Sequence, residues 1–214
     1  MKIFVISSQR TGTTSTGKFF LQSGFKVATY AVGLKNLWTP KWFEGDYESI
    51  FKSNDFKNNQ VFEDNPWWCE DFYKYLYFRF PDSQFVLVER DSDKWFDSMM
   101  SRGKGKTLGC TYLHSRIYNR ESDYNNLNVY ENGKPRFHNL SKMDKLLPMN
   151  NNHREHYTKI YKSRNLEIKR FFERNDKSRL INVKLEDPNK WEKIANHFNI
   201  KNYPKQIWEN KSKN

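Results

Sequence analysis

The stretch IFVISSQRTGTTST, residues 3–16, decides how this chain is expected to fold. Its first four residues, Ile3 to Ile6, form a continuous apolar run that is typical of a strand buried on both faces of a parallel sheet. A polar loop with one glycine follows from Ser7 to Thr14, and residues 15–22 are expected to form a helix. Phe25 to Ala28 is expected to form a second strand, so the chain is predicted to open with a strand–helix–strand unit.

The same alternation continues to the end of the chain. Further strands are predicted at 60–63, 85–89 and 180–185, with short helices and loops over 31–60. Longer helices are predicted from Asn65-Pro66 to about Phe80, from a cap at Ser92, over 153–175 and from Asp187-Pro188. This pattern predicts an α/β fold of three layers, a central parallel sheet flanked by helices. The length suits a single domain, 1–214, in which 102–152 is a variable lid or acceptor-recognition region.

The charge of the chain limits its partners without naming one. A formal net charge of +12 favours polyanionic partners such as a nucleotide with several phosphates. The Lys and Arg residues are scattered, which excludes a basic tail. Two distant cysteines, Cys69 and Cys110, make neither a metal pattern nor a disulfide framework. With no apolar stretch long enough for a secretion signal or a membrane span, a cytoplasmic location is expected.

The loop at residues 8–15 carries the first chemical signal. Backbone N–H groups at a helix N-terminus attract anions, and Gly12 lets the backbone approach a ligand closely. Arg10 adds a planar cation that suits oxyanions, and hydroxyls come from neighbouring residues. The candidate phosphate-binding residues are Arg10, Thr11, Gly12, Thr13, Thr14 and Ser15.

Two other function classes compete at this point. Gly12 to Lys18 matches most of a Walker A loop, but Phe19 stands where magnesium coordination needs Ser or Thr. A P-loop kinase or NTPase is therefore the alternative, and a basic nucleic-acid-binding module without a recognisable reader motif is the third.

Arg90 and Ser98 carry the second signal. Arg90 follows the predicted strand 85–89, and ligands of open α/β sheets bind outside the carboxyl ends of strands. Ser98 comes eight positions later in the next predicted helix, and an arginine with a hydroxyl suits a second phosphate. A structural pair of Arg90 with Asp91 or Glu89, beside a solvated Ser98, is the alternative interpretation.

Together the two segments resemble the P-loop sulfotransferases. Arg10 to Ser15 looks like the family's 5′-phosphosulfate loop, and Arg90 with Ser98 looks like its 3′-phosphate pair. The resemblance implies a sulfuryl transfer from 3′-phosphoadenosine-5′-phosphosulfate (PAPS) to a hydroxyl or amine of a carbohydrate or small molecule. It also implies adenosine 3′,5′-bisphosphate as product and no metal. Ser15 departs from the pattern, since many cytosolic members have a tryptophan there that stacks on adenine.

The transfer needs a general base for the proton of the acceptor. Glu63-Asp64-Asn65-Pro66 follows a predicted strand and resembles an Asp-x-Pro signature of some sulfotransferase subfamilies. Asn65 is expected to cap the following helix and leave Asp64 free. Asp64 is the first candidate base, Glu63 the second, and His114 and His138 are weaker ones. Arg10 is the candidate for stabilising charge on the leaving oxygen.

Overall fold

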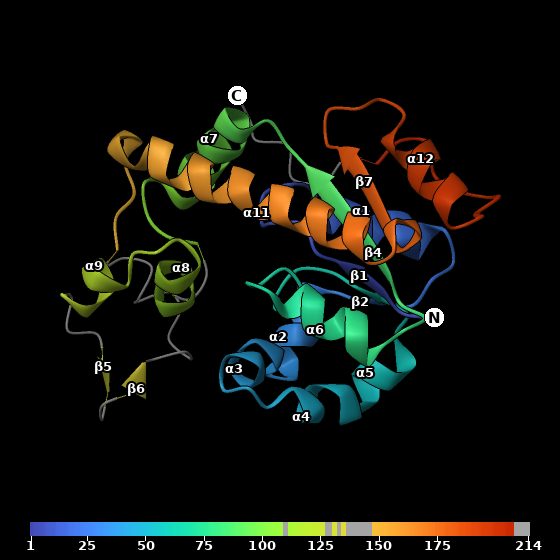
Figure 1. Cartoon of the computed structure of the whole chain (residues 1–214), viewed down its shortest axis with the longest axis horizontal. Helices are drawn as coiled ribbons and strands as arrows, with labels where there is room; N and C mark the ends of the chain where they lie inside the picture. The colour runs from blue at the N-terminus through green and yellow to red at the C-terminus, as the bar shows by residue number, and fades with distance from the viewer. Residues whose placement is uncertain (109–110, 127–129, 132–133, 136–146, 208–214) are drawn as a thin grey trace. The chain divides into compact units, whose positions relative to one another are not determined.

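The computed structural model describes residues 1–108, 111–126, 130–131, 134–135 and 147–207 (Figure 1). The chain forms two compact units, which are described separately below. The first unit contains Met1–Arg90 and Glu167–Lys211, and the second contains Asp91–Leu166 and Ser212–Asn214, each as far as it is described. Helix α11 (Arg154–Arg174) includes the boundary between them.

The first unit is built on a five-stranded parallel sheet with the order β2-β3-β1-β4-β7. Its strands are β1 (Ile3–Val5), β2 (Val27–Ala28), β3 (Val61–Phe62), β4 (Gln84–Glu89) and β7 (Leu180–Lys184). Phe4 lies opposite Phe62 of β3 and Phe85 of β4, which places β1 at the centre. The predicted α/β fold with a parallel sheet flanked by helices is confirmed.

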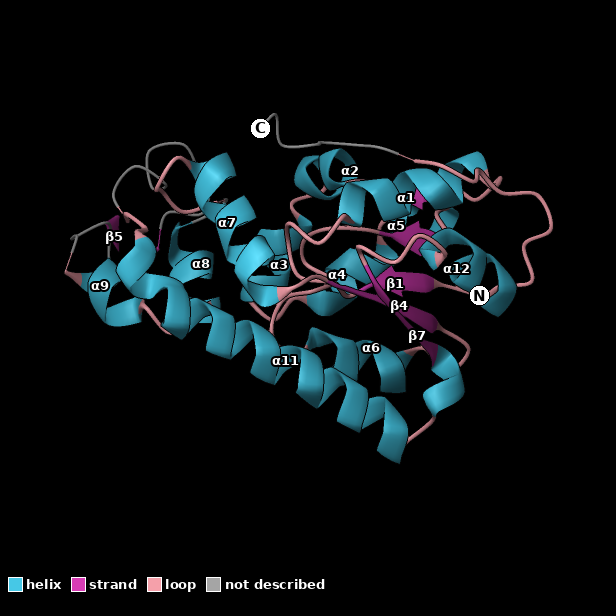
Figure 2. Ribbon diagram, turned by 90° about the horizontal axis from the view of Figure 1, so that it is seen from above, coloured by secondary structure: helices cyan, strands magenta, loops and turns pink. Residues whose placement is uncertain are grey.

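Residues alternate between the two faces of this sheet, as a period of two requires. One face packs on α1 (Thr13–Gln22) and α12 (Lys190–His197), where the Phe19 and Trp191 rings stack with centroids 5.0 Å apart. The buried residues of this layer are Ile3, Val5, Phe19, Phe20, Val61, Val86, Val88, Val183, Trp191 and Ile194. Figure 2 shows α1 and α12 on one side of the strands and α6 on the other.

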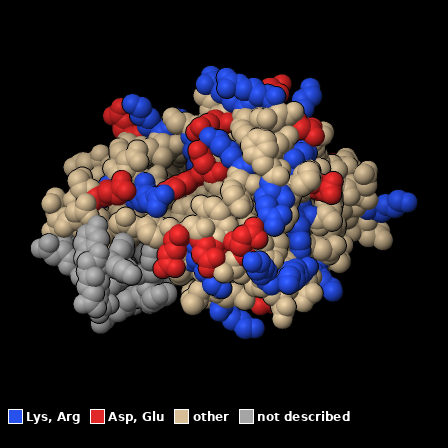
Figure 3. All heavy atoms as spheres, turned by 60° about the horizontal axis from the view of Figure 1, so that its bottom comes forward, with Lys and Arg blue, Asp and Glu red and all other residues tan. Residues whose placement is uncertain are grey.

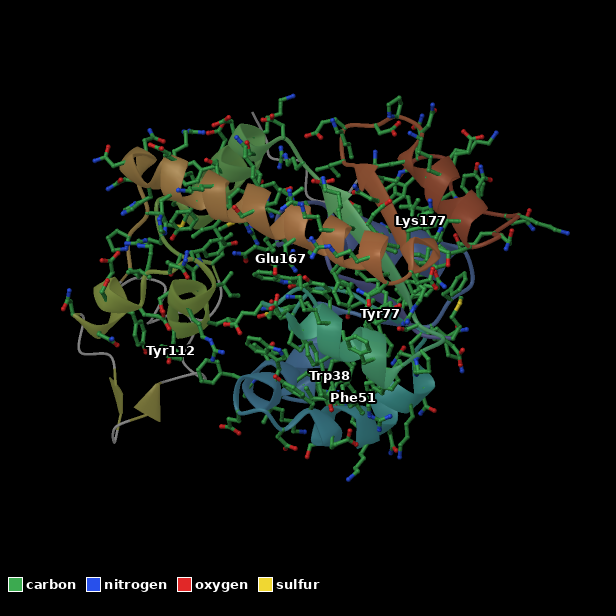
Figure 4. The ribbon with its side chains drawn as sticks, in the orientation of Figure 1. Trp38, Phe51, Tyr77, Tyr112, Glu167 and Lys177 are labelled. Atoms are coloured by element: carbon green, nitrogen blue, oxygen red, sulfur yellow. The ribbon has the colours of Figure 1, made fainter. Side chains whose placement is uncertain are left out.

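Aromatic rings fill the opposite face. Phe4 contacts Phe62, Trp67 and Phe85 with centroids 5.3 to 5.7 Å apart. Rings of this layer come from α3 (Trp38–Phe43), α4 (Tyr47–Lys52), α5 (Asn54–Asn58), α6 (Phe72–Arg79) and the last turns of α11. Helix α2 (Tyr30–Lys35) follows β2. Trp38, Phe51 and Tyr77, labelled in Figure 4, join this layer from α3, α4 and α6. These rings explain how a chain that is 36% hydrophobic buries a core.

The second unit has its own core. It contains α7 (Ser92–Gly103), α8 (Thr111–Ile117), α9 (Glu121–Asn125), the strands β5 (Tyr130–Glu131) and β6 (Lys134–Pro135), the 3-10 turn η1 (Asn151–His153) and the first part of α11. Trp95 of α7 stacks on Tyr161 of α11 with centroids 4.4 Å apart. Phe96, Met99, Tyr118, Met149 and Tyr157 complete the cluster. The predicted inner face of α7, with Trp95, Phe96 and Met99, is confirmed.

Several predicted helix starts are wrong. The segment after Asn65-Pro66 is not helical, because α6 begins only at Phe72 and the Asn65–Pro66 bond is cis. Pro66, Trp67, Trp68 and Cys69 are all buried, and four consecutive residues cannot share one face of a helix.

The other corrections concern caps. Asp91, not Ser92, caps α7, since its Oδ1 accepts the N–H groups of Asp93 and Lys94. Helix α1 begins at Thr13, two residues earlier than predicted, and α12 begins at Lys190. Among the described residues, no helix has the length and apolar character needed to cross a membrane.

Candidate functional site

The turn between β1 and α1 has an unusual and closely packed backbone. Arg10 and Gly12 both have positive φ angles, 66° and 88°. The Thr11 hydroxyl donates to the Ser8 carbonyl at 2.6 Å, so it holds the turn together. A Cβ at position 12 would lie 2.8 Å from Leu185 Cδ1, so there is no room for a side chain. Only glycine combines this conformation with this close approach.

The N-terminus of α1 follows this turn directly. Its N-cap is Gly12, which has no side chain, and its first turn contains no acidic residue. The first helical bond runs from Thr16 N–H to the Gly12 carbonyl at 2.9 Å, so Thr13, Thr14 and Ser15 precede the hydrogen-bonded part of the helix. The positive end of the helix dipole is thus not neutralised by a carboxylate of its own first turn, as an anion site requires.

The remaining side chains of the loop differ in exposure. Thr14 is exposed, Arg10 is half-buried, and Thr13 and Ser15 are buried. Lys18 lies in the second turn of α1, beyond the strand-to-helix turn where a Walker A lysine would stand.

Sheet order brings further predicted residues to the same edge. Since β3, β1 and β4 are parallel neighbours, the residues after them meet at their carboxyl ends. Ser7 ties the start of the loop to β4, because its Oγ accepts the Val88 N–H at 2.6 Å and donates to the Val86 carbonyl at 3.3 Å.

Arg90, which follows β4, reaches the turn between β1 and α1. Its Nη1 donates to the backbone carbonyl of Arg10 at 3.4 Å. Its Nε lies 3.6 Å from the Glu186 Oε1, and the Arg90 side chain is 22% exposed. The predicted pairing of Arg90 with Asp91 or Glu89 is not what organises this site, since Asp91 caps α7 and Glu89 pairs with Lys169 at 3.1 Å.

Ser98 belongs to the second unit. It lies in α7 and is 5% exposed, so the alternative of a solvated serine is wrong. Its role in phosphate binding stays a prediction from the sequence.

Glu63 and Asp64 follow β3 with different environments. Glu63 is 4% exposed, its Oε1 accepts the Tyr30 N–H at 3.2 Å, and its Cγ lies 2.9 Å from where a Cβ of Gly17 would be. Within the described part of the chain, its Oε2 has no hydrogen-bond partner. Burial raises the pKa of Glu63 to about 7, and the negative charge of Asp64 adds to this increase. The hydrogen bond from the Tyr30 N–H acts in the opposite direction and lowers the pKa.

Asp64 is half-buried and has a φ of 69°. Its Oδ1 accepts the Asn65 N–H at 2.8 Å, so Asn65 is not the cap of a helix that leaves Asp64 free. Burial raises the pKa of Asp64, and hydrogen bonds from Asn65 and Trp68 act in the opposite direction. Both carboxyl groups therefore hold their protons more tightly than exposed ones do.

Of the two histidine candidates, only His114 lies among the described residues, and it belongs to the second unit. It is buried in α8, and its Nε2 lies 2.7 Å from the Tyr157 hydroxyl. Burial, and then the charge of Arg120, lower the pKa of His114 to about 3. His138 and Cys110 lie outside the described residues, as do 109–110, 127–129, 132–133 and 136–146 of the predicted acceptor region.

Glu186 and Leu185 were missed by sequence reasoning. They follow β7, whose neighbour in the sheet is β4, so their position after a parallel strand was the available signal. Leu185 N–H donates to the Glu89 carbonyl at 2.6 Å, which holds the start of this loop beside Arg90. In the described ranges, no group of three or more His, Cys, Asp or Glu residues is arranged to hold a metal ion.

Comparison with known proteins agrees with this arrangement. A search of curated proteins found no match. A family model described as the sulfotransferase domain matches residues 2–212, which is nearly the whole chain. The protein therefore belongs to the sulfotransferase domain family.

Proposed function

We propose that the protein transfers a sulfuryl group from PAPS to a hydroxyl or amine of an acceptor, a carbohydrate or another small molecule. The main observation behind this proposal is that two elements suited to binding anions lie at the same edge of the sheet. The uncapped N-terminus of α1 lies after the Gly12 turn, and the Arg90 guanidinium contacts the backbone of that turn at 3.4 Å. A nucleotide with phosphates at both 5′ and 3′ positions needs two such elements.

The donor end is assigned to the turn. Backbone N–H groups and hydroxyls of Thr11 to Ser15 bind the 5′-phosphate and sulfonate oxygens, and Arg10 stabilises charge on the bridging oxygen. Arg90 binds the 3′-phosphate as a charge-assisted donor. Gly12 fits this assignment because the turn is closely packed, and a Cβ at this position would lie 2.8 Å from Leu185 Cδ1.

The chemistry is an in-line displacement at sulfur. The acceptor oxygen forms a bond to sulfur while the bond from sulfur to the bridging phosphate oxygen breaks, and adenosine 3′,5′-bisphosphate leaves. By analogy with phosphoryl transfer, positioning and electrostatic stabilisation supply most of the catalysis. No step of this scheme requires a metal ion.

Asp64 is proposed as the base that takes the proton of the acceptor. It is half-buried, whereas Glu63 is enclosed between Tyr30 and Gly17. A raised pKa brings a carboxylate closer to the operating pH and makes it a better proton acceptor. Glu63 is the second candidate for this role.

The remaining assignments are part of the same proposal. The chain is taken as one domain, 1–214, with 102–152 as the acceptor-recognition region. A cytoplasmic location is proposed because the two cysteines, Cys69 and Cys110, lie far apart in the sequence and make no disulfide framework. On the face drawn in Figure 3, Lys and Arg side chains lie among acidic ones, so this face does not offer a continuous basic surface to a nucleic acid.

Thermal unfolding with nucleotides tests the donor. A ligand at 100 times its Kd stabilises the folded state by about 2.7 kcal/mol, which raises Tm by several degrees. We expect this shift with adenosine 3′,5′-bisphosphate in EDTA and a smaller one with AMP. Stabilisation only by Mg-ATP would instead support a kinase, and equal shifts with any polyanion, lost in salt, would support a nucleic-acid-binding module.

A further inference from the structure

Arg90 has an acidic neighbour that the proposed reaction does not use. The Glu186 carboxylate lies 3.6 Å from Arg90 Nε, a distance that suits an ion pair but is too long for a good hydrogen bond. The Glu186 side chain is 40% exposed, so water screens the pair and the carboxylate is free to rotate. The contact is therefore weak enough for a ligand to replace it.

The loop that carries Glu186 is held firmly at the site. Leu185 N–H donates to the Glu89 carbonyl at 2.6 Å, and Leu185 Cδ1 fills the space where a Cβ of Gly12 would be. This packing keeps the Glu186 backbone beside the phosphate loop, whichever way its side chain turns.

The two acidic residues that flank Arg90 in the sequence have partners of their own, and Asp91 caps α7. Both Glu89 carboxylate oxygens accept from Lys169 Nζ, at 3.1 and 3.2 Å, and Oε1 also accepts from Asn182 at 2.8 Å. Glu89 is thus neutralised by its own partners, and Glu186 is the carboxylate that competes for the guanidinium.

Lys190 is a second cation whose charge interacts with that of Glu186. Burial lowers the pKa of the Lys190 ammonium, while the nearby carboxylates of Asp187 and Glu186 act to raise it. Lys190 begins α12, so it stays close to the loop. Arg90 is therefore not the only cation near Glu186 among the described residues.

We propose that Glu186 is a built-in competitor for the 3′-phosphate. It pairs with Arg90 in the free protein, gives way when the nucleotide binds, and returns to speed release of the product. This inference rests on the proposed function, because it takes Arg90 as the 3′-phosphate ligand. It makes Glu186 a positioning residue that sets how long the nucleotide is retained.

Nucleotide binding to Glu186→Gln tests this, since glutamine keeps the shape and removes the charge. A screened ion pair contributes up to about 1 kcal/mol, so we expect adenosine 3′,5′-bisphosphate to bind about fivefold more tightly, mainly through slower dissociation. AMP, which has no 3′-phosphate, should bind the variant and the parent equally. Titration calorimetry gives the affinities and stopped-flow displacement gives the dissociation rates.

Asp187→Asn is the matched control. It removes the same charge one residue away, but Asp187 pairs with Lys193 at 2.6 Å and accepts the Asn189 N–H, both within its own loop and α12. We expect its nucleotide affinity to equal that of the parent.

Each other outcome overturns the proposal. Unchanged or weaker bisphosphate binding in Glu186→Gln means that Glu186 does not compete for Arg90. If Glu186→Gln binds AMP more tightly by the same factor, or if Asp187→Asn gains the same affinity for the bisphosphate, then only the overall electrostatic potential of the surface has changed. If the parent itself binds no bisphosphate while remaining folded, the proposed function fails and this inference fails with it.

Discussion

The guanidinium of Arg90 donates to the backbone carbonyl of Arg10 at 3.4 Å, although 80 positions separate the two residues. The contact exists because β1 and β4 are parallel neighbours, so the turn after β1 and the residue after β4 lie at the same edge of the sheet. It places a fixed cation against the loop that leads into α1. The proposed donor site depends on this relationship.

Substitution of Gly12 by alanine should destabilise that loop. Gly12→Ala forces a positive φ on a residue with a Cβ, which costs about 1–2 kcal/mol, and also drives the methyl into Leu185. We expect lower stability in urea unfolding and loss of nucleotide binding.

Gly24→Ala separates the two effects. Gly24 has a φ of 89°, but nothing lies within 4 Å of the added Cβ. It should lose only about 1 kcal/mol and keep the nucleotide affinity of the parent. Equal binding by both variants would show that the Gly12 turn does not contact the nucleotide.

Asp64→Asn should separate chemistry from binding. Loss of a general base lowers turnover by roughly 10²–10⁴-fold, while a neutral isostere leaves the donor site intact. The measurement is release of adenosine 3′,5′-bisphosphate from PAPS with the sugar or phenol, from an acceptor panel, that the parent uses.

Asp71→Asn is the control for that experiment, because Asp71 is an exposed acid paired with Lys74 at 2.9 Å. It should keep full turnover. Full turnover in Asp64→Asn as well would remove Asp64 from the mechanism and direct attention to Glu63.

Ionisation of Glu63 should make the folded protein less stable as the pH rises from about 4.5 to about 7. Its pKa rises from 4.5 to about 7 on folding, so the folded chain keeps a proton that the unfolded chain releases between these values. Stability therefore falls as pH rises through this window, by about 2–3 kcal/mol for this group. Urea unfolding at pH 5 and pH 8 should show this loss in the parent.

The variant Glu63→Gln should lose less stability over the same interval, since glutamine does not titrate. Some loss remains, because burial also raises the pKa of Asp64. An identical fall in the parent and the variant would mean that Glu63 is ionised in the folded protein.

Local sequence patterns predicted the strands and the turn between β1 and α1, because both are encoded by neighbouring residues. The run Ile3 to Ile6 and the glycine at position 12 need only short-range information. The segment from Pro66 to Cys69 was mistaken for a helix because a proline after an asparagine is a common helix start. Its burial on all sides depends on contacts with distant rings such as Phe4, which no local pattern reports.

The electrostatics of the site were also beyond local patterns. Glu63 and Asp64 were recognised as candidates, but their order of burial depends on Tyr30 and Gly17, which come from separate elements. Glu186 was missed because its importance comes from a contact with Arg90 across the sheet edge. Every residue that follows a parallel strand is a candidate for the site, whatever its type, because ligands bind at the carboxyl ends of these strands.

The most direct test of the account is the affinity of Arg90→Ala for adenosine 3′,5′-bisphosphate and for AMP, measured by titration calorimetry. A charged hydrogen bond contributes about 1.5–3 kcal/mol, so the parent should prefer the bisphosphate by roughly 10- to 100-fold, and the variant should bind both ligands alike. Arg79→Ala, which removes an exposed arginine paired with Glu48, should keep the preference of the parent. A folded Arg90→Ala protein that still prefers the bisphosphate as strongly as the parent would contradict the assignment of Arg90 to the 3′-phosphate.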